Sequence, residues 1–172
     1  LFDETLRQKG SDGTPLVKVL LDQGILPGIK VDKGTQSLPS SSNELITEGL
    51  DGLRDRLNEY AELGAVFTKW RGVITINDDI PSNYCIETNA HALARFAALS
   101  QEAGLVPIVE PEVLMDGNHS IDRCLEVNEA TLNEVYSQLA RQRVILEGTL
   151  LKPSMVLSGS TADNRAETKT AP

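Results

Sequence analysis

Residues 106–112, VPIVEPE, form a short apolar run that ends in two glutamates. Three other stretches share this design: 28–33 (GIKVDK), 66–71 (VFTKWR) and 144–152 (VILEGTLLK). Each stretch carries a charged residue that marks its position in the chain: Lys30, Lys69, Glu110 and Lys152. Successive members of this series are 39, 41 and 42 residues apart. A strand, a loop, a helix and a return loop need about 30 or more residues. The interval therefore predicts successive strand–helix units, one for each stretch.

The segments between these stretches show helical periodicity, because apolar residues recur at steps of three and four. The pattern covers 14–24, 50–64, 86–104 and 125–139, and a glycine ends each of the first three. In the last segment we expect a break near Asn128. Alternating strands and helices with short connections predict an α/β fold, a parallel sheet covered by helices.

Several stretches fall outside this alternation. Residues 36–43 (QSLPSSSN) predict a surface loop, and the acidic residues that follow predict a solvated face: Glu44, Glu48, Asp51 and Asp55. Residues 158–172 have almost no apolar content, so we expect a polar, disordered tail after a folded domain of residues 1–157. Leu1-Phe2 resembles the middle of a buried strand, so we expect the chain to be a piece of a longer protein.

Composition narrows the class of function. Of 172 residues, 16 are Lys or Arg and 25 are Asp or Glu, and the formal charge is −9. This acid excess argues against a nucleic-acid or anionic-membrane surface, although local basic clusters could still bind phosphates. No apolar run approaches the roughly 18 residues of a membrane helix. Two cysteines, Cys85 and Cys124, are too few for a disulfide framework and fit a reducing compartment.

The charged residues at the strand ends are the candidate chemical groups. In parallel α/β folds, ligands bind where the carboxyl ends of the strands meet. Residues two apart on a strand face the same side, which predicts that Lys69 and Arg71 share a face and that Glu110 and Glu112 do too. We therefore expect one pocket of alternating cations and carboxylates.

Such a pocket suits Schiff-base chemistry. A lysine amine attacks a ketone only when unprotonated, and its pKa of about 10.4 must be lowered by desolvation or a nearby cation. Lys69 could be that cation for Lys152, in a site shielded from water. A carboxylic acid such as Glu110 could protonate the hydroxyl that leaves as water. Arg71 and Lys30 could hold anionic phosphates.

Six motifs in the chain resemble the class I fructose-bisphosphate aldolases, in the same order and at the same intervals. They are IKVDKG (29–34), TEGLDGL (47–53), KWR (69–71), VPIVEPE (106–112), DGNH (116–119) and EGTLLKPSMV (147–156). The resemblance implies a (β/α)8 TIM barrel, here only a central portion of about five βα units. It also implies cleavage of fructose 1,6-bisphosphate to dihydroxyacetone phosphate and glyceraldehyde 3-phosphate through a lysine Schiff base, with no cofactor or metal.

The resemblance assigns roles residue by residue. Lys152 matches the Schiff-base lysine, Glu110 the general acid/base, and Lys69 a group that stabilises charge near the nucleophile. Three residues match substrate-binding positions: Arg71 at a phosphate, Lys30 in positioning, and Glu112 as a carboxylate that supports the lysines. Two neighbours depart from the family's usual residues, since Thr68 stands where Ala is common and Ser154 where Asn is common.

The resemblance also sets expectations about the whole protein. The family's catalytic Asp and its C-terminal phosphate-binding loops would lie outside Leu1–Pro172, so we expect the chain alone to be insoluble or inactive. The implied full-length protein is a cytoplasmic or plastid-stromal homotetramer that binds a sugar phosphate and neither nucleic acid nor membrane. The alternatives are another lysine-dependent barrel lyase and a non-catalytic scaffold or binding protein. His91 and His119 are too few for a typical catalytic zinc site, and we expect packing or turn roles for both.

Overall fold

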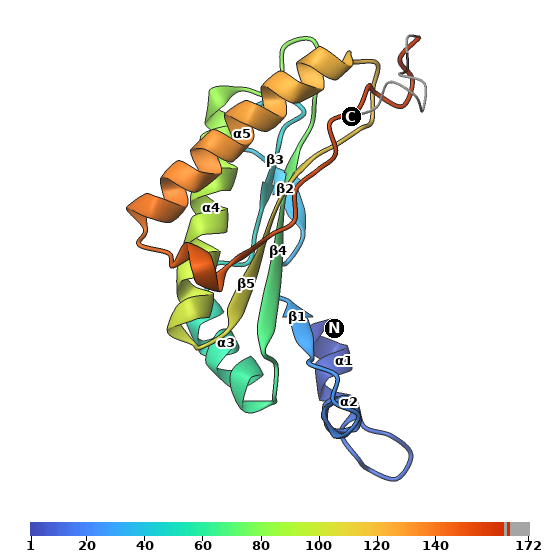
Figure 1. Ribbon diagram of the computed structural model, residues 1–172, viewed down its shortest axis with the longest axis vertical. Coiled ribbons are helices and arrows are strands. Elements are labelled where there is room, and N and C mark those ends of the chain that lie inside the picture. The colour runs from blue at the N-terminus through green and yellow to red at the C-terminus, as the bar shows by residue number, and fades with distance from the viewer. Residues whose placement is uncertain (164, 166–172) are drawn as a thin grey trace.

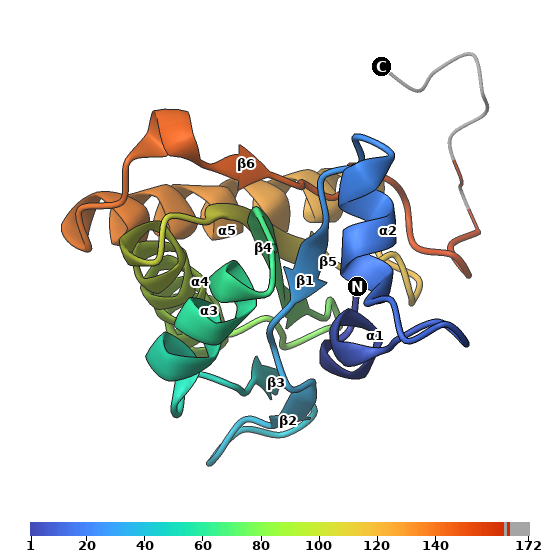
Figure 2. The ribbon, with the colours of Figure 1, turned by 90° about the horizontal axis from the view of Figure 1, so that it is seen from below.

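The protein is built around a sheet of four parallel strands, in the order β1-β4-β5-β6 (Figure 1, with β6 labelled in Figure 2). The structure is a computed structural model that describes residues 1–163 and 165. The strands are β1 (Gly28–Lys30), β4 (Phe67–Ile74), β5 (Val106–Val113) and β6 (Leu150–Leu151). Each overlaps one of the stretches predicted as strands, so the predicted parallel α/β arrangement is confirmed.

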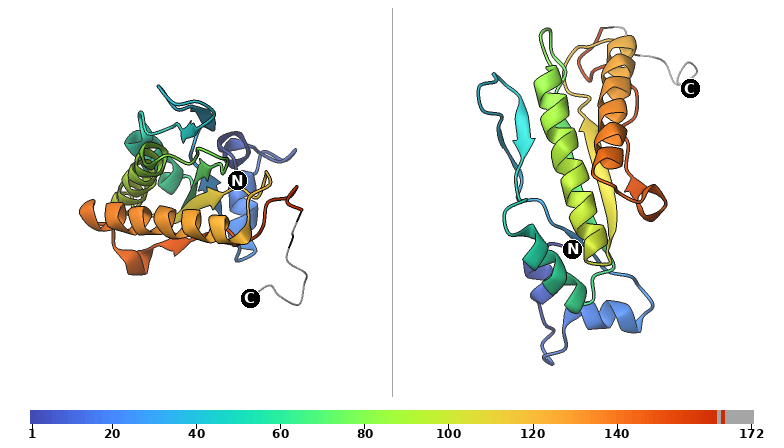
Figure 3. Two further views of the ribbon diagram at one scale, coloured as in Figure 1. Left: turned by 90° about the horizontal axis from the view of Figure 1, so that it is seen from above. Right: turned by 90° about the vertical axis from the view of Figure 1, so that its left-hand side faces the viewer.

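Two helices precede β1 in sequence, and the longer helices lie between the later strands. The helices are α1 (Asp3–Arg7), α2 (Leu16–Asp22), α3 (Leu53–Glu62), α4 (Asn83–Glu102) and α5 (Ile121–Arg141), with a short 3-10 helix at Leu146–Gly148. Figure 2 shows α3, α4 and α5 on the outer side of a curved row of strands, and Figure 3 shows α4 and α5 running side by side. The helices α2 to α5 match the predicted helical segments, and α1 was not predicted.

Alternation along the strands separates the core from the opposite face of the sheet. Ile29, Trp70 and Val109 are buried with the helices, and the Trp70 ring stacks on Phe96 of α4 with 5.6 Å between centroids. The prediction that Trp70 packs between sheet and helices is therefore confirmed. Because side chains alternate along a strand, the charged neighbours of these residues project from the other face.

Helix α5 is continuous, so the predicted break near Asn128 is wrong. The side-chain amide of Asn128 donates a 2.8 Å hydrogen bond to the carbonyl oxygen of Cys124 one turn earlier. A polar residue that bonds back along its own helix need not interrupt it. At the start of α5, the hydroxyl of Ser120 accepts a hydrogen bond from the backbone N–H of Arg123 at 3.1 Å and caps the helix.

The first two residues differ from the buried strand that was expected. The terminal amino group of Leu1 donates to the carbonyl oxygen of Gly28 at 2.6 Å, and Lys30 N–H donates to the carbonyl oxygen of Leu1 at 2.9 Å. Leu1 thus lies along β1 as a strand would, but the Leu1 and Phe2 side chains are exposed. The described residues supply four parallel strands, not a fifth one beginning at Leu1.

Residues 36–43 are partly a hairpin, not simply a surface loop. Strand β2 (Thr35–Ser37) covers the first two of them and pairs antiparallel with β3 (Leu45–Thr47), which follows them. Glu44, expected on a solvated face, is only 3% exposed. Its carboxylate accepts hydrogen bonds from the backbone N–H of Ser82 at 2.6 Å and from the Ser82 hydroxyl at 2.7 Å. This carboxylate therefore ties the hairpin to the start of α4.

The segment after β6 bonds to the loop between β5 and α5. The backbone N–H groups of Gly159, Ser160 and Thr161 donate to carbonyl oxygens of His119, Met115 and Gly117, at 2.8, 2.7 and 2.9 Å. These residues begin the stretch predicted as a polar tail, and most of the rest of that stretch (164 and 166–172) lies outside the described residues. Within the described part of the chain, no helix is both long and apolar enough to cross a membrane.

Candidate active site

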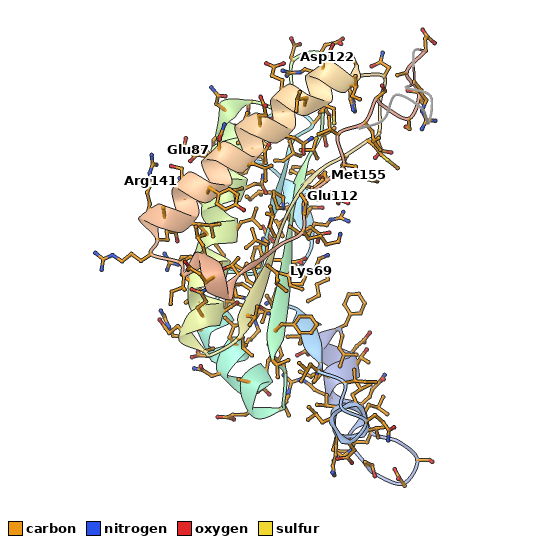
Figure 4. The ribbon with its side chains drawn as sticks, in the orientation of Figure 1. Lys69, Glu87, Glu112, Asp122, Arg141 and Met155 are labelled. Atoms are coloured by element: carbon orange, nitrogen blue, oxygen red, sulfur yellow. The ribbon has the colours of Figure 1, made fainter. Side chains whose placement is uncertain are left out.

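The strand register brings the predicted site residues onto one face of the sheet. Lys30 of β1 lies opposite Lys69 of β4, and Arg71 of β4 lies opposite Glu110 of β5. Figure 4 shows Lys69 and Glu112 on the face turned away from α4 and α5. Strands β1, β4 and β5, together with Lys152 directly after β6, therefore contribute charged side chains to one surface.

Glu110 is the centre of this cluster. Its side chain is 3% exposed, and each carboxylate oxygen meets a different ammonium group. Oε1 accepts a hydrogen bond from Nζ of Lys152, and Oε2 pairs with Nζ of Lys69. The structure thus brings together the three residues expected to be catalytic.

The charge state of Glu110 follows from these contacts. Burial by itself raises the pKa of this carboxyl, but the Lys152 and Lys69 ammonium groups outweigh burial, so the pKa of Glu110 lies below its ordinary value. The resting group is therefore an ionised carboxylate near neutral pH. An ionised carboxylate has no proton to donate, so Glu110 must first accept one from Lys152 before it can act as an acid.

Lys152 is more open to water than expected. Its backbone N–H donates to the carbonyl oxygen of Val109 at 2.9 Å, which continues the β5–β6 ladder, but its side chain is 60% exposed. In the order β1-β4-β5-β6 described here, β6 is an edge strand, which leaves one side of the lysine uncovered. Beside it lies a cavity of about 350 Å³ whose lining includes Glu110, Glu112, Lys152, Ser154 and Met155. The nucleophile candidate therefore faces a space that a small ligand could enter.

The three expected substrate-binding residues fall into two separate ion pairs. Nη1 of Arg71 lies 3.1 Å from Oε2 of Glu112, so Glu112 pairs with an arginine and not with a lysine as expected. Nζ of Lys30 pairs with Oδ1 of Asp32. Asp32 carries a buried carboxylate that the sequence analysis did not single out. Its spacing of two residues from Lys30 was the available signal, because it puts both on one face.

The comparisons with known proteins agree with this geometry. The family model "Fructose-bisphosphate aldolase class-I" matches residues 1–171. The chain belongs to the class I fructose-bisphosphate aldolase family. A "Probable fructose-bisphosphate aldolase class 1" from Xanthomonas campestris is 63% identical over 166 residues, which are 96% of this chain and 50% of that protein. "Fructose-bisphosphate aldolase 6, cytosolic" from Arabidopsis thaliana is 56% identical over 93% of this chain and 45% of its own length.

A solved aldolase shares the fold. The Plasmodium falciparum fructose-bisphosphate aldolase, crystallised with TRAP and a small-molecule inhibitor, superposes with a TM-score of 0.94 at 46% identity. The match covers 98% of this chain and 49% of that one. The aldolase fold is a TIM barrel, and the curved parallel sheet is a portion of it. The chain spans about half the length of the curated aldolases that it matches.

The two departures from the usual aldolase residues both have partners. The hydroxyl of Thr68 donates to the hydroxyl of Ser100 at 2.9 Å, and both side chains are buried. The hydroxyl of Ser154 accepts a hydrogen bond from the backbone N–H of Val113 at 2.7 Å. Ser154 therefore ties the segment after Lys152 to the end of β5.

The histidines and cysteines lie apart from the charged cluster around Glu110. The side-chain amide of Gln142 lies 3.4 Å from Nδ1 of His91 at the surface, and His119 is buried beside the start of α5. Both cysteines are buried free thiols. Across residues 1–163 and 165, no group of three or more His, Cys, Asp or Glu side chains is arranged to hold a metal ion.

Proposed function

We propose that this chain supplies the Schiff-base half of a fructose-bisphosphate aldolase, which cleaves fructose 1,6-bisphosphate to dihydroxyacetone phosphate and glyceraldehyde 3-phosphate. The observation that carries the proposal is the placement of Glu110 between the ammonium groups of Lys69 and Lys152. This arrangement joins a nucleophile, a proton carrier and a fixed positive charge. All three are needed for imine formation at a ketone.

The first steps follow from the hydrogen bond between Lys152 and Glu110. The Lys152 ammonium transfers a proton to the Glu110 carboxylate, and the free amine adds to the C2 carbonyl of the ketose. The resulting carbinolamine hydroxyl takes the proton from Glu110 and leaves as water, which forms the protonated imine. Lys69 keeps a positive charge beside this centre, and that charge favours the ionised carboxylate between turnovers.

In this proposal the other cations bind the anionic ends of the substrate. Arg71 and Lys30 each carry a counter-charge in the structure, from Glu112 and Asp32. A phosphate would compete with those carboxylates for the cation, and Arg can bind it through two parallel hydrogen bonds. Glu112 then orients Arg71 when no substrate is bound.

The wider properties proposed for the full-length protein rest on its family. They are a cytoplasmic location, a homotetrameric assembly, a sugar-phosphate ligand, and no requirement for nucleic acid or membrane. Two of the similar plant aldolases are named cytosolic, which supports the location.

The test uses a full-length chimaera in which this chain replaces the matched half of the Xanthomonas campestris relative. The chimaera is incubated with fructose 1,6-bisphosphate and borohydride, and the modified lysine is located by mass spectrometry. We expect adduct at Lys152, none after Lys152→Met, and no change after Lys9→Met, a matched substitution of an exposed lysine outside the cluster.

Other outcomes of the trapping experiment would contradict the proposal. An adduct at Lys69 in place of Lys152 would assign the nucleophile differently. A folded chimaera that traps a different keto-sugar phosphate and not fructose 1,6-bisphosphate would favour another lysine-dependent barrel lyase. A folded chimaera that traps nothing would favour a non-catalytic binding role.

A further inference from the structure

We propose that Asp32 is a positioning residue, which holds Lys30 away from Glu110 so that Lys69 and Lys152 alone share the Glu110 carboxylate. This inference rests on the function proposed above and deepens it. It begins from the register, in which Lys30 and Lys69 are direct partners in the β1–β4 ladder. Neighbouring strands lie about 4.8 Å apart, so like charges on direct partners repel.

The structure gives each of these two lysines its own carboxylate. Lys69 pairs with Glu110 on one side, and Lys30 pairs with Asp32 on the other. Both carboxylates are 3% exposed, whereas the Lys30 side chain is 30% exposed. Lys69, the ladder partner of Lys30, already binds Glu110. Without the Asp32 charge, we infer that the Lys30 ammonium turns toward Glu110 and competes with Lys152 for it.

Asp32 is held in a fixed frame. Its Oδ1 accepts a 3.1 Å hydrogen bond from the backbone N–H of Gly34, in addition to the bond from Lys30. Gly49, with a φ of +127°, lies so close that an added Cβ would meet the Asp32 Cα at 3.3 Å. Arg56 donates to the carbonyl oxygen of Val31 at 2.9 Å and also to that of Gly49. The frame therefore fixes the backbone that carries Asp32.

The second carboxylate oxygen of Asp32 marks this side chain as more than a surface charge. Oδ2 is buried and has no hydrogen-bond partner among the described residues. A buried carboxylate with one oxygen unpaired destabilises the folded state. If Asp32 only had to accept the hydrogen bond from the loop, an asparagine could do so without the buried charge. The negative charge of Asp32 is useful here because it neutralises Lys30.

The test compares Asp32→Asn, Lys30→Met and the double variant in the full-length chimaera. Asparagine keeps an oxygen that can accept the Gly34 N–H, so the substitution removes the charge and preserves the shape. Glu48→Gln is the matched control, because Glu48 lies exposed on the segment that bonds to residues 33 and 34. Thermal melting checks that every variant is folded.

We expect Asp32→Asn to lower kcat roughly 10- to 100-fold, the size of effect that a misplaced catalytic group produces. The loss should require Lys30. Lys30→Met alone should mainly raise KM, and adding it to Asp32→Asn should return kcat to the value of Lys30→Met. A purely structural role for Asp32 would not be rescued by removing Lys30.

Two failures are distinguishable. If the unmodified chimaera does not form an adduct at Lys152, the proposed function fails irrespective of Asp32. If the chimaera is active, then an unchanged kcat in folded Asp32→Asn, or a double variant that stays as slow as Asp32→Asn, overturns the Asp32 inference alone. A second readout needs no turnover: in Asp32→Asn, carbon-labelled Glu110 should titrate at a lower pH than in the parent and in Glu48→Gln.

Discussion

The buried carboxylate of Glu110 on β5 binds the ammonium group of Lys152, which follows β6 at the edge of the sheet. The two residues are 42 positions apart, and the parallel β5–β6 ladder joins them, with Ile108 opposite Leu150 and Val109 opposite Leu151. Because the ladder sets this distance, the charge pair is part of the fold as well as of the candidate chemistry.

Glu110→Gln should destabilise the chimaera, and the effect should depend on pH. The substitution leaves two lysines without their shared carboxylate. Breaking a fully buried pair costs about 3–5 kcal/mol, and we expect roughly 1–3 kcal/mol here because both lysines are partly exposed. The measurement is the free energy of unfolding of parent and variant, with Glu62→Gln on the surface of α3 as control.

The sign of the pH dependence follows from the lowered pKa of Glu110. The ionised carboxylate stabilises the folded state fully above the unfolded-state pKa of about 4.3, and this stabilisation disappears as the pH falls through the lower folded-state value. The gap between parent and Glu110→Gln should therefore shrink below about pH 4. A gap of constant size from pH 7 to pH 3 would be inconsistent with the ion pairs described here.

The Thr68–Ser100 hydrogen bond predicts a coupled pair of substitutions. Thr68→Val keeps the shape but leaves the buried Ser100 hydroxyl without its partner, at a cost of about 1–3 kcal/mol. Adding Ser100→Ala removes the unpaired group, so the double variant should be nearly as stable as the parent. Chemical denaturation of all four proteins measures the coupling, with exposed Thr35→Val as control. Additive losses would argue against this bond.

Cys85 should be unreactive in the folded protein. Burial, with help from the nearby Glu44 carboxylate, raises the pKa of its thiol to about 12. The thiolate is the reactive form, so alkylation at pH 8 should be far slower in native protein than in urea. Mass spectrometry after iodoacetamide treatment gives the extent. Rapid native labelling of Cys85 would mean that the α4–hairpin contact opens readily.

The open edge at β6 predicts self-association of this chain by itself. Leu150 is 55% exposed on a strand whose outer backbone groups lie unpaired in the described part of the chain. Such an edge is a template for another strand, and a charged residue blunts it. Leu150→Lys should lower the sedimentation coefficient of the chain more than Leu26→Lys does, a control at an exposed leucine outside the sheet. Equal association in both variants would place the contact elsewhere.

Local patterns were enough to predict the strands, the longer helices and the face that carries Lys69 and Glu110. Apolar residues that recur every two residues mark one face of a strand, and those that recur every three to four mark one face of a helix. This pattern can be recognised in the sequence alone. The six spaced motifs added the aldolase family. The same local patterns misplaced Glu44, because an acidic residue after a serine-rich stretch carries no sign of the distant Ser82 that it binds.

Tertiary structure decided which charges meet. The register sets Arg71 opposite Glu110, yet the two oxygens of Glu110 bind Lys69 and Lys152. Arg71 binds Glu112 instead. Exposure was likewise undetermined by the sequence, since Lys152 lies 60% open beside an edge strand while Glu110 beneath it is buried. Both the pairing and the exposure depend on contacts between residues far apart in the chain. Such long-range contacts produce no periodic pattern in the local sequence, so they could not be predicted from it.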